Sequence, residues 1–366
     1  MYRRVAGVGL ALTMLVAGCG HSSSTSQGPA TSSTPVPSVA TSSTRAASAT
    51  SQAARDLPDP HTLRGLTEVP ELPDPKPVEG SSAQKLPVTV TDVEGNKVTI
   101  KSTSRILALD LYGTLSRTLI GLGLGDKIVG RTVSSTEKQL HDRPVVTENG
   151  HVLNVEAVAG LKPSVIIADR SVGPKEALDQ LRKSGIPVVL VDPHRSVGST
   201  PQLIRTIADA VGKPDAGEAL VKRTQEQIDQ AKKQIAAWKP AKPMRVAFLY
   251  VRGNAGVFFI LGSENGASEL IQGVGADDVA SDKGITTLVP ANAESLVSIN
   301  PDAIFVMRDG LASTGGMKGL LARAGVANTT AGRKQRVISI PDGISLSFGP
   351  QTGEVLTAVA LSLIHI

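Results

Sequence analysis

The sequence contains a single cysteine, Cys19, among its 366 residues. A disulfide therefore cannot form within the chain, and no other thiol is present to serve as a nucleophile. Aromatic residues make up only 2% of the chain, too few for the stacking platform that binds single-stranded nucleic acid. The Lys and Arg residues that give a formal net charge of +5 are scattered rather than clustered. No nucleic-acid partner is expected.

The common catalytic motifs are also missing from the sequence. There is no Walker A motif and no G-x-S-x-G elbow. The stretch GLGLGDKIVG places Gly121, Gly123 and Gly125 at the end of a predicted helix, without the G-x-G-x-x-G spacing of a dinucleotide site. The chain has six histidines, and the predicted lobes contain too few of them for a zinc or manganese receptor. Such a receptor needs three or four His and carboxylate ligands. A binding protein for another kind of ligand is favoured over an enzyme.

The first twenty residues, MYRRVAGVGLALTMLVAGCG, have the layout of a secretory signal, with two arginines before an apolar run over Val5–Ala17. That run is too short to span a bilayer as a permanent helix. It ends in the lipobox LVAGC, whose small residues fit the lipoprotein signal peptidase and whose cysteine receives the lipid. We expect a signal peptide over residues 1–18 and lipid attachment at Cys19, which holds the mature protein at the extracytoplasmic face of the cell membrane.

Residues 19–85 are mostly Ser, Thr, Ala and Pro, as in HSSSTSQGPATSSTPVPSVATSSTRAAS. Such a stretch buries too little apolar surface to offset the entropy lost on ordering, so we expect a disordered tether. Folded structure is then expected to start at Leu86. The stretch LPVTVTDVEGNKVTI predicts a β-hairpin, because apolar and polar residues alternate on both sides of the EGN turn.

Beyond the hairpin, short apolar strands alternate with helical patterns, as in RILALDL, KIVGRTV, SVIIADR and IPVVLVD. This alternation predicts a parallel sheet in an α/β lobe over residues 86–214. Residues 215–240 predict one long helix, because apolar residues recur at helical spacing and Pro240 ends the pattern. The alternation resumes at MRVAFLYV, which predicts a second α/β lobe over residues 241–360. The expected fold is two similar α/β lobes joined by a single helix.

The two lobes share a repeated motif. NVEAVAGLKPSVIIADR and NAESLVSINPDAIFVMRD each contain Asn-x-Glu, a proline seven residues after the glutamate, and then a buried strand. Each glutamate, Glu156 and Glu294, falls near the start of a short predicted helix, where the helix dipole favours an anion. The proline ends each helix before the strand. Both glutamates suit a helix start, and their recurrence in both halves also points to a shared role.

Together these features resemble the helical-backbone, or class III, substrate-binding proteins of ABC importers for vitamin B12, siderophores and haem. Within that group, LDLYGTLSRTLIGLGLGDKIVGRTVSS, TENGHVLNVEA and LYVRGNAGVFFI are similar to the HmuT-type haem-binding lipoproteins of corynebacteria and related actinobacteria. The resemblance covers Leu86 to about Ala360. It implies that haem, iron protoporphyrin IX, is bound between the lobes for iron acquisition. It also implies delivery to an ABC permease with a separate ATPase subunit.

The resemblance assigns site residues by position. In that family a histidine of one lobe and a tyrosine of the other hold the haem iron, which here implies His151 and Tyr250 as axial ligands. The arginine beside the tyrosine corresponds to Arg252. One acidic residue per lobe docks on the permease, which implies Glu156 and Glu294. Three candidates for binding the haem propionates are not ranked by the sequence, namely Arg131, Arg170 and Tyr112.

The chemistry of ferric iron agrees with these residue types. Ferric iron is a hard cation that favours an anionic oxygen, so a tyrosinate suits a protein that captures haem. An unperturbed phenol titrates near pH 10, so the iron and a neighbouring cation have to favour the phenolate. Residues i and i+2 of a strand share a face, which predicts that the Arg252 guanidinium lies beside the Tyr250 oxygen. Among the other histidines, His194 is an alternative pocket residue, whereas His21 and His61 fall in the tether and His141 in a charged loop.

The sequence therefore favours a haem-binding protein that is not an enzyme. The alternative within the family is a ferric-siderophore or cobalamin-binding lipoprotein, which leaves His151 and Tyr250 unexplained. Surface haem-donor proteins are further candidate partners. The last six residues, LSLIHI, match the translation of a transposon-end sequencing adapter, so residues 361–366 are expected to be a foreign tail that includes His365.

Overall fold

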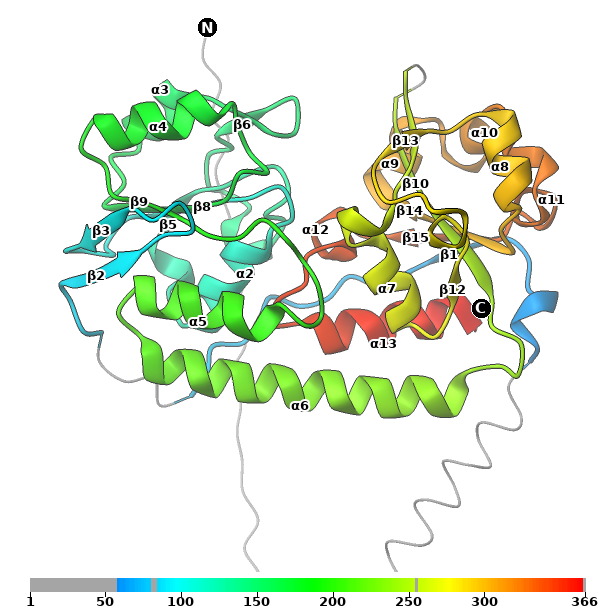
Figure 1. Ribbon diagram of the computed structural model, residues 1–366, viewed down its shortest axis with the longest axis horizontal. Helices are drawn as coiled ribbons and strands as arrows, with labels where there is room; N and C mark the ends of the chain where they lie inside the picture. Colours follow the sequence, from blue (N-terminus) through cyan, green and yellow to red (C-terminus); the bar gives the residue numbers. More distant parts are fainter. Residues whose placement is uncertain (1–57, 80–83, 254–255, 365–366) are drawn as a thin grey trace, which may run out of the picture. The chain divides into compact units, whose positions relative to one another are not determined.

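The computed structural model describes residues 58–79, 84–253 and 256–364 (Figure 1). The predicted signal peptide, Cys19 and the first part of the predicted tether lie outside the described residues. In the ranges that are described, no helix combines the length and the apolar character needed to cross a lipid bilayer. Both lobes belong to the unit Ala47–Ile366.

The N-terminal lobe contains a four-stranded parallel sheet with the strand order β5-β4-β8-β9. Its strands are β4 (Ile106–Leu109), β5 (Ile128–Gly130), β8 (Val165–Ala168) and β9 (Val188–Leu190). The strands are almost wholly buried, because helices cover both faces of the sheet. One face carries α2 (Thr114–Gly121) and α5 (Thr200–Ala210), and the other carries α3 (Val155–Gly160) and α4 (Lys175–Lys183). The predicted parallel sheet is confirmed.

The predicted hairpin is also confirmed. It consists of β2 (Val88–Thr91) and β3 (Lys97–Ile100), which pair in antiparallel fashion with Val90 opposite Val98. Gly95 in the turn has a φ of +83°, a left-handed conformation that favours glycine. The apolar side of the hairpin packs against the core that the central sheet shares with α2 and α5.

The C-terminal lobe is built on a seven-stranded sheet with the order β1-β15-β14-β10-β11-β13, and β12 pairs with β10. Its parallel strands are β1 (Leu66–Glu68), β10 (Arg245–Arg252), β12 (Asp277–Asp278), β14 (Ala303–Met307) and β15 (Val337–Ile340). Strand β11 (Val257–Ile260) pairs in antiparallel fashion with β10, and β13 (Val289–Pro290) pairs in antiparallel fashion with β11. The second lobe therefore has a mixed sheet, with a hairpin formed by β10 and β11 at the point where the Tyr250 segment turns back.

The helices of the C-terminal lobe are short apart from the last. They are α7 (Ala267–Gly273), α8 (Ala293–Ile299), α9 (Arg308–Ser313), α10 (Gly316–Leu321), α11 (Thr330–Lys334), α12 (Asp342–Ser345) and α13 (Thr352–Ile364). The remaining described elements are the strand pair β6 (Thr147–Glu148) and β7 (Val152–Leu153) and the 3-10 turns η1 (Pro60–Thr62), η2 (Gly125–Lys127), η3 (Lys138–Leu140), η4 (Ser263–Asn265), η5 (Ser281–Lys283) and η6 (Val326–Asn328).

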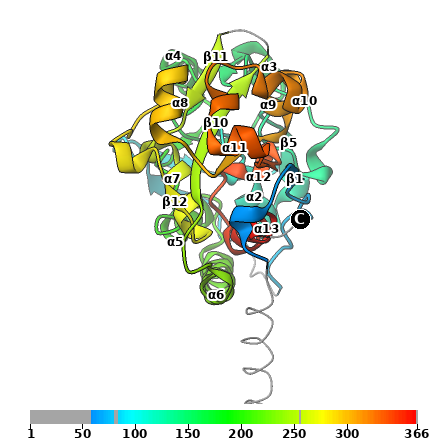
Figure 2. The same cartoon turned by 90° about the vertical axis from the view of Figure 1, so that its right-hand side faces the viewer.

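Helix α6 (Pro214–Trp238) connects the lobes and agrees closely with the predicted helix over 215–240. In Figures 1 and 2 it runs along the base of both lobes. Leu220 belongs to the core of the N-terminal lobe, whereas Ile235 belongs to the core of the C-terminal lobe. Helix α13 packs closely on α6, since a Cβ at Gly353 would lie 2.5 Å from the backbone carbonyl of Gln227. One continuous helix therefore contributes to both cores.

The prediction that folded structure starts at Leu86 is wrong. Strand β1, within the segment assigned to the tether, pairs with β15, and the Val69 side chain that follows it is fully buried. The buried Arg336 donates from Nη1 to Thr67 Oγ1 at 2.6 Å. Farther along, Asp74 accepts hydrogen bonds from the backbone of η3 in the N-terminal lobe. This segment is ordered by contacts with distant strands and loops. Its own apolar residues are sparse, so the local sequence does not predict that it is folded.

Candidate ligand-binding site

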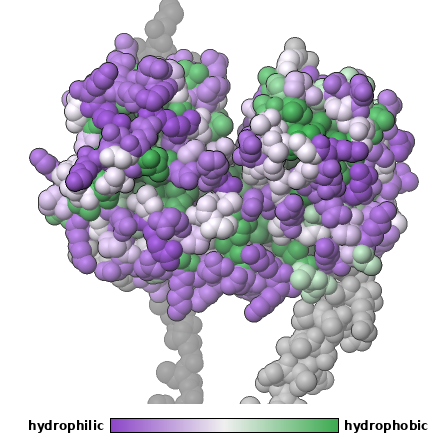
Figure 3. Space-filling view, viewed as in Figure 1, coloured by the Kyte–Doolittle hydropathy of each residue, from purple (hydrophilic) through white to green (hydrophobic). Residues whose placement is uncertain are grey.

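A cavity of about 350 Å³ lies between the two lobes. Figure 3 shows the hollow between the lobes on the side away from α6. The residues that line it are Leu111, Tyr112, Val133, Ser134 and His151 from the N-terminal lobe, and Tyr250, Arg252, Leu261, Asn265, Leu288, Met307, Asp309, Asp342 and Leu346 from the C-terminal lobe. Most of the wall is apolar, with polar groups from both sides, as is usual for a small-molecule site.

The topology explains why distant residues meet in this cavity. Strands β10, β14 and β15 are parallel neighbours, and Arg252, Asp309 and Asp342 stand at or just after their carboxyl ends. In the other lobe, Tyr112 and Ser134 follow β4 and β5 in the same way. Ligands of open α/β sheets bind outside the carboxyl ends of the strands. The cavity therefore lies among the loops that follow the carboxyl ends of the strands of both sheets.

Tyr250 reaches the cavity because of its position in β10. Burial of the side chains alternates at the end of the strand. Tyr250 and Arg252 are partly buried on one side of the sheet, and Val251 is buried on the other. Both Tyr250 and Arg252 line the cavity, as the i, i+2 spacing predicted. The ring of Tyr250 packs against the core of the C-terminal lobe, and its strand is paired on both sides by β14 and β11. Its position is therefore set by a rigid element.

The predicted contact between Arg252 and the Tyr250 oxygen needs correction. The guanidinium carbon of Arg252 lies 5.2 Å from the centroid of the Tyr250 ring, which is a cation–π arrangement. The Nη2 atom donates to Asp342 Oδ1 at 2.5 Å and lies 3.4 Å from the sulfur of Met307. Asp342 also accepts from the backbone N–H of Asp309 at 2.8 Å. The arginine is thus drawn over the ring by a carboxylate 90 residues away, which the local spacing did not reveal.

His151 comes from the turn between β6 and β7 in the N-terminal lobe. Asn149 and Gly150 before it both have positive φ, which reverses the chain, and the His151 carbonyl accepts from the backbone of Gly173 at 2.9 Å. The residue is exposed and lines the cavity. Within the described ranges its imidazole makes no hydrogen bond to the protein. An imidazole nitrogen and a phenol oxygen from opposite lobes are therefore both available to one ligand.

A buried charge cluster backs the N-terminal wall of the cavity. Asp110 follows β4 and Asp169 follows β8, and both carboxylates are fully buried beside Arg195. Arg195 pairs directly with Asp169 and lies 3.6 Å from Asp110 Oδ2. Burial raises the pKa of Asp110 to about 7, and the nearby carboxylate of Asp169 adds to the effect of burial. The guanidinium of Arg195 lies 5.4 Å from the ring centroid of Tyr112, which connects this cluster to the cavity.

The other residues weighed as ligand contacts lie elsewhere. Arg170 forms ion pairs with Glu94 and Asp179 and does not line the cavity, and Arg131 donates to backbone carbonyls of its own loop. His194 bonds to Asp192 and is also outside the lining. Of the three candidates for binding the propionates, Tyr112 lines the cavity and Arg131 and Arg170 do not.

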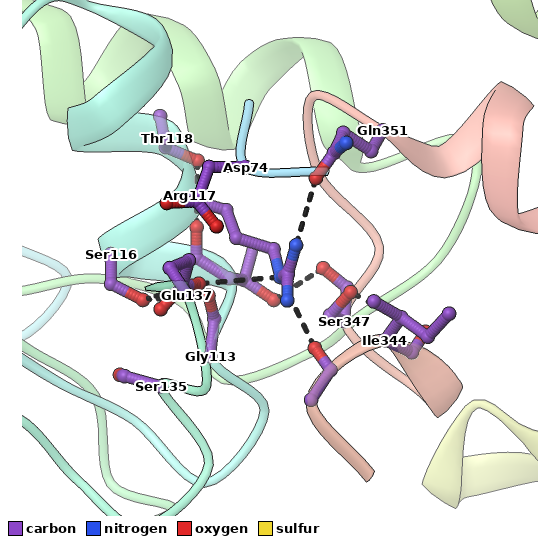
Figure 4. Close-up of polar contacts among 12 residues, drawn as sticks. Asp74, Gly113, Ser116, Arg117, Thr118, Ser135, Glu137, Ile344, Ser347 and Gln351 are labelled. Atoms are coloured by element: carbon purple, nitrogen blue, oxygen red, sulfur yellow. Dashed lines mark hydrogen bonds and ion pairs between the residues drawn. The ribbon is translucent and has the colours of Figure 1, made fainter. Parts of the chain in front are cut away.

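The floor between the lobes is held by polar contacts that the sequence did not reveal (Figure 4). Arg117 of α2 donates to the carbonyl of Gly343 at 3.2 Å and to Gln351 Oε1 at 2.8 Å in the other lobe. It also pairs with the buried Glu137 at 3.3 Å. Burial raises the pKa of Glu137. Arg117 lies 226 and 234 residues from Gly343 and Gln351, so no local signal marks the contacts between the lobes.

The repeated Asn-x-Glu motif forms matching helix starts. Asn154 caps α3 by accepting from the backbone of Ala157 at 2.9 Å, and Asn292 caps α8 by accepting from Ser295 at 2.8 Å. Glu156 and Glu294 are each the second residue of their helix and are exposed. In Figures 1 and 2, α3 and α8 both lie at the end of the lobes opposite α6. The geometry leaves both carboxylates accessible on one side of the protein.

Comparison with known proteins agrees with this fold. The family described as periplasmic binding protein matches residues 111–343. The ABC transporter substrate-binding lipoprotein YvrC of Bacillus subtilis (strain 168) is 27% identical over 279 residues, which is 76% of this chain and 85% of that protein. A cobalamin-binding protein of Halobacterium salinarum is 25% identical over 275 residues, which is 73% of this chain and 72% of that protein.

Solved structures are more similar in sequence. The heme binding protein HmuT is 49% identical with a TM-score of 0.82, covering 84% of this chain and 99% of that one. The periplasmic heme-binding protein RhuT from Roseiflexus sp. RS-1 is 31% identical with a TM-score of 0.67, covering 72% and 98%. Further matches are HmuT point mutants in which a histidine, a tyrosine or an arginine is replaced by alanine.

Proposed function

Because the chain belongs to the periplasmic binding protein family, it is the substrate-binding protein of an ABC transporter rather than an enzyme, and we propose that its substrate is haem. The observation that carries the proposal is that His151 and Tyr250, from opposite lobes, line the same cavity. Haem iron accepts one axial ligand on each face of the porphyrin. A histidine on one wall and a tyrosine on the other match that requirement.

The similarity to HmuT supports the same residues. In the HmuT mutants, the interval between the replaced histidine and tyrosine equals the interval from His151 to Tyr250. The interval between the replaced tyrosine and arginine equals that from Tyr250 to Arg252. We infer that His151 and Tyr250 are the axial ligands and that Arg252 supports the tyrosine by holding positive charge over its ring.

The apolar part of the wall suits the rest of the ligand. Leu111, Val133, Leu288 and Leu346 line the cavity around the polar groups, and a porphyrin face favours such contacts. Of these, Leu111, Val133 and Leu288 are large apolar side chains that remain substantially exposed in the protein without ligand. A flat apolar ligand would cover them, whereas a hydrophilic ligand would not.

Delivery and anchoring complete the proposal. Glu156 and Glu294, exposed at the ends of the lobes opposite α6, are the proposed contacts with the ABC permease. Cys19 is the proposed lipid attachment site, which places the protein on the extracytoplasmic face of the membrane next to that permease. The similarity to the lipoprotein YvrC supports this location.

A comparison of ligands tests the substrate. Parent protein from Ala47 onward is titrated with ferric haem, with cyanocobalamin and with a ferric siderophore, and binding is followed by absorption and tryptophan fluorescence. We expect a saturable change at one equivalent of haem and none with the other two ligands. Cobalamin is the second candidate, because relatives about 25% identical bind it. Saturable binding of cobalamin and not of haem would replace the proposed substrate.

A further inference from the structure

The cavity contains a second tyrosine, Tyr112, on the wall opposite Tyr250. Tyr112 lies between the end of β4 and the start of α2 in the N-terminal lobe, and its ring also packs against the core of the C-terminal lobe. One face of the ring is covered by the Arg195 guanidinium. The residue lines the cavity and is held in place by contacts from both lobes.

The environment of Tyr112 keeps its phenol neutral. Burial raises the pKa of Tyr112, and the carboxylate of Asp169 adds to that effect. Arg195 acts in the opposite sense, but its charge is engaged by Asp169 and faces Asp110. Iron ligation needs the phenolate, so this tyrosine is poorly suited to bind iron. A neutral phenol is instead a hydrogen-bond donor.

Among the described residues, the Tyr112 hydroxyl has no hydrogen-bond partner, although the side chain is largely buried. A polar hydroxyl facing a cavity gains most from a charged acceptor, because hydrogen bonds to ionised groups are about twice as strong as neutral ones. Haem has only two charged acceptors at its periphery, its carboxylates. Arg131 and Arg170, the other candidates for that role, do not line the cavity.

We propose that Tyr112 is a further contact residue for the ligand, which donates its hydroxyl hydrogen to a carboxylate of the porphyrin and does not bind the iron. The inference rests on the proposed haem-binding function and adds a residue that selects for the free carboxylate form of the ligand. In this proposal His151 and Tyr250 bind the iron. The two tyrosines of the cavity therefore have different roles, because Tyr250 binds the metal and Tyr112 binds a carboxylate.

The test compares the parent protein with Tyr112→Phe, which removes only the hydroxyl and retains the ring that packs between the lobes. Three ligands are titrated: ferric haem, iron-free protoporphyrin IX and the dimethyl ester of haem, whose carboxylates are blocked. The variant is expected to bind haem and protoporphyrin IX about tenfold more weakly than the parent. It is expected to bind the dimethyl ester as the parent does, with an unchanged spectrum of bound ferric haem.

Each other outcome overturns the inference in a recognisable way. Parental affinity for both free-acid ligands, or the same loss for the dimethyl ester, shows that no carboxylate contact exists. A changed ferric spectrum shows that Tyr112 binds the iron. The titration of the parent protein tests the proposed function by itself, because a parent that does not bind haem would contradict that function. The outcomes above concern only the role of Tyr112.

Discussion

The guanidinium of Arg252 lies over the ring of Tyr250 and is paired with the carboxylate of Asp342. The cation nearest the proposed iron ligand is therefore partly neutralised in the protein without ligand. The Asp342 carboxylate also fixes where the Arg252 guanidinium lies relative to the Tyr250 ring.

Asp342→Asn removes that negative charge and keeps an oxygen that accepts from Asp309. The Arg252 guanidinium then loses the ion pair that holds it over the Tyr250 ring. We expect the variant to bind ferric haem about threefold to tenfold more weakly, with a changed absorption spectrum of the bound haem. Absorption titrations of the parent and the variant with ferric haem measure both quantities. Parental affinity together with a parental spectrum would contradict a role of Asp342 in positioning Arg252.

Gly310 sits where the backbone of α9 approaches Arg252. A Cβ at this position would lie 2.5 Å from Arg252 Nη1 and 2.6 Å from the carbonyl of Val251. We expect Gly310→Ala to displace the guanidinium and to destabilise the protein by about 1–3 kcal/mol. It should also alter the spectrum of bound haem in the manner of Arg252→Ala.

Gly160→Ala is the matched control for that experiment. A Cβ at Gly160 meets no atom within 4 Å, and the residue does not require a positive φ. Thermal unfolding and the haem spectrum of this variant should match the parent. If Gly310→Ala also behaves like the parent, the position of Arg252 does not depend on this close contact.

Asp110 makes stability depend on pH. Its pKa is raised from an ordinary value of 3.8 to about 7, chiefly by burial. Between these values the folded state binds more protons than the unfolded state, so this carboxyl lowers stability as the pH rises through that window. Asp110→Asn removes the titration. The free energy of unfolding of the variant, relative to the parent, should therefore increase from about pH 4 to about pH 7, by on the order of 1 kcal/mol or more.

Denaturant unfolding of the ligand-free protein at a series of pH values measures this difference. Asp126→Asn changes an exposed carboxylate in the same lobe and serves as the control for the loss of a surface carboxylate. A difference between Asp110→Asn and the parent that is constant over the same range would contradict the assignment of the titration to Asp110.

Glu156 and Glu294 are predicted to act in transport and not in ligand binding. The double variant Glu156→Lys, Glu294→Lys should bind haem with parental affinity, because both side chains are exposed and outside the cavity lining. Haem uptake by cells that depend on this protein should fall at least tenfold, because reversed charges repel the cationic partner. Glu226→Lys, on the exposed side of α6, is the control and should retain uptake. Full uptake by the double variant counts against docking through these residues.

The sequence predicted those parts of the fold that local patterns encode. Helix α6, the β2–β3 hairpin and the strands of the N-terminal sheet all follow from periodicity within short windows. Strand β1 was not predicted, because it is formed by pairing with β15, which lies about 270 residues farther along the chain. The antiparallel course of β11 depends on pairing that the apolar pattern does not specify.

The site was predictable in part for the same reason. His151, Tyr250 and Arg252 lie in motifs that resemble a known family, and the structure brings all three to one cavity. Asp342, which sets the position of Arg252, follows a different strand and has no signal of its own. The cluster of Asp110, Asp169 and Arg195 is assembled from three separate loops, so only the folded chain brings it to the back of the cavity.

The most direct test of the central claim is the absorption spectrum of ferric haem bound to the parent protein, to His151→Ala, to Tyr250→Phe and to His194→Ala as a control outside the cavity. We expect the parent to bind one equivalent of haem, each of the two ligand variants to bind haem more weakly with a changed spectrum, and the control to keep the parental spectrum. Parental spectra for both His151→Ala and Tyr250→Phe would contradict the assignment of these residues as the axial ligands.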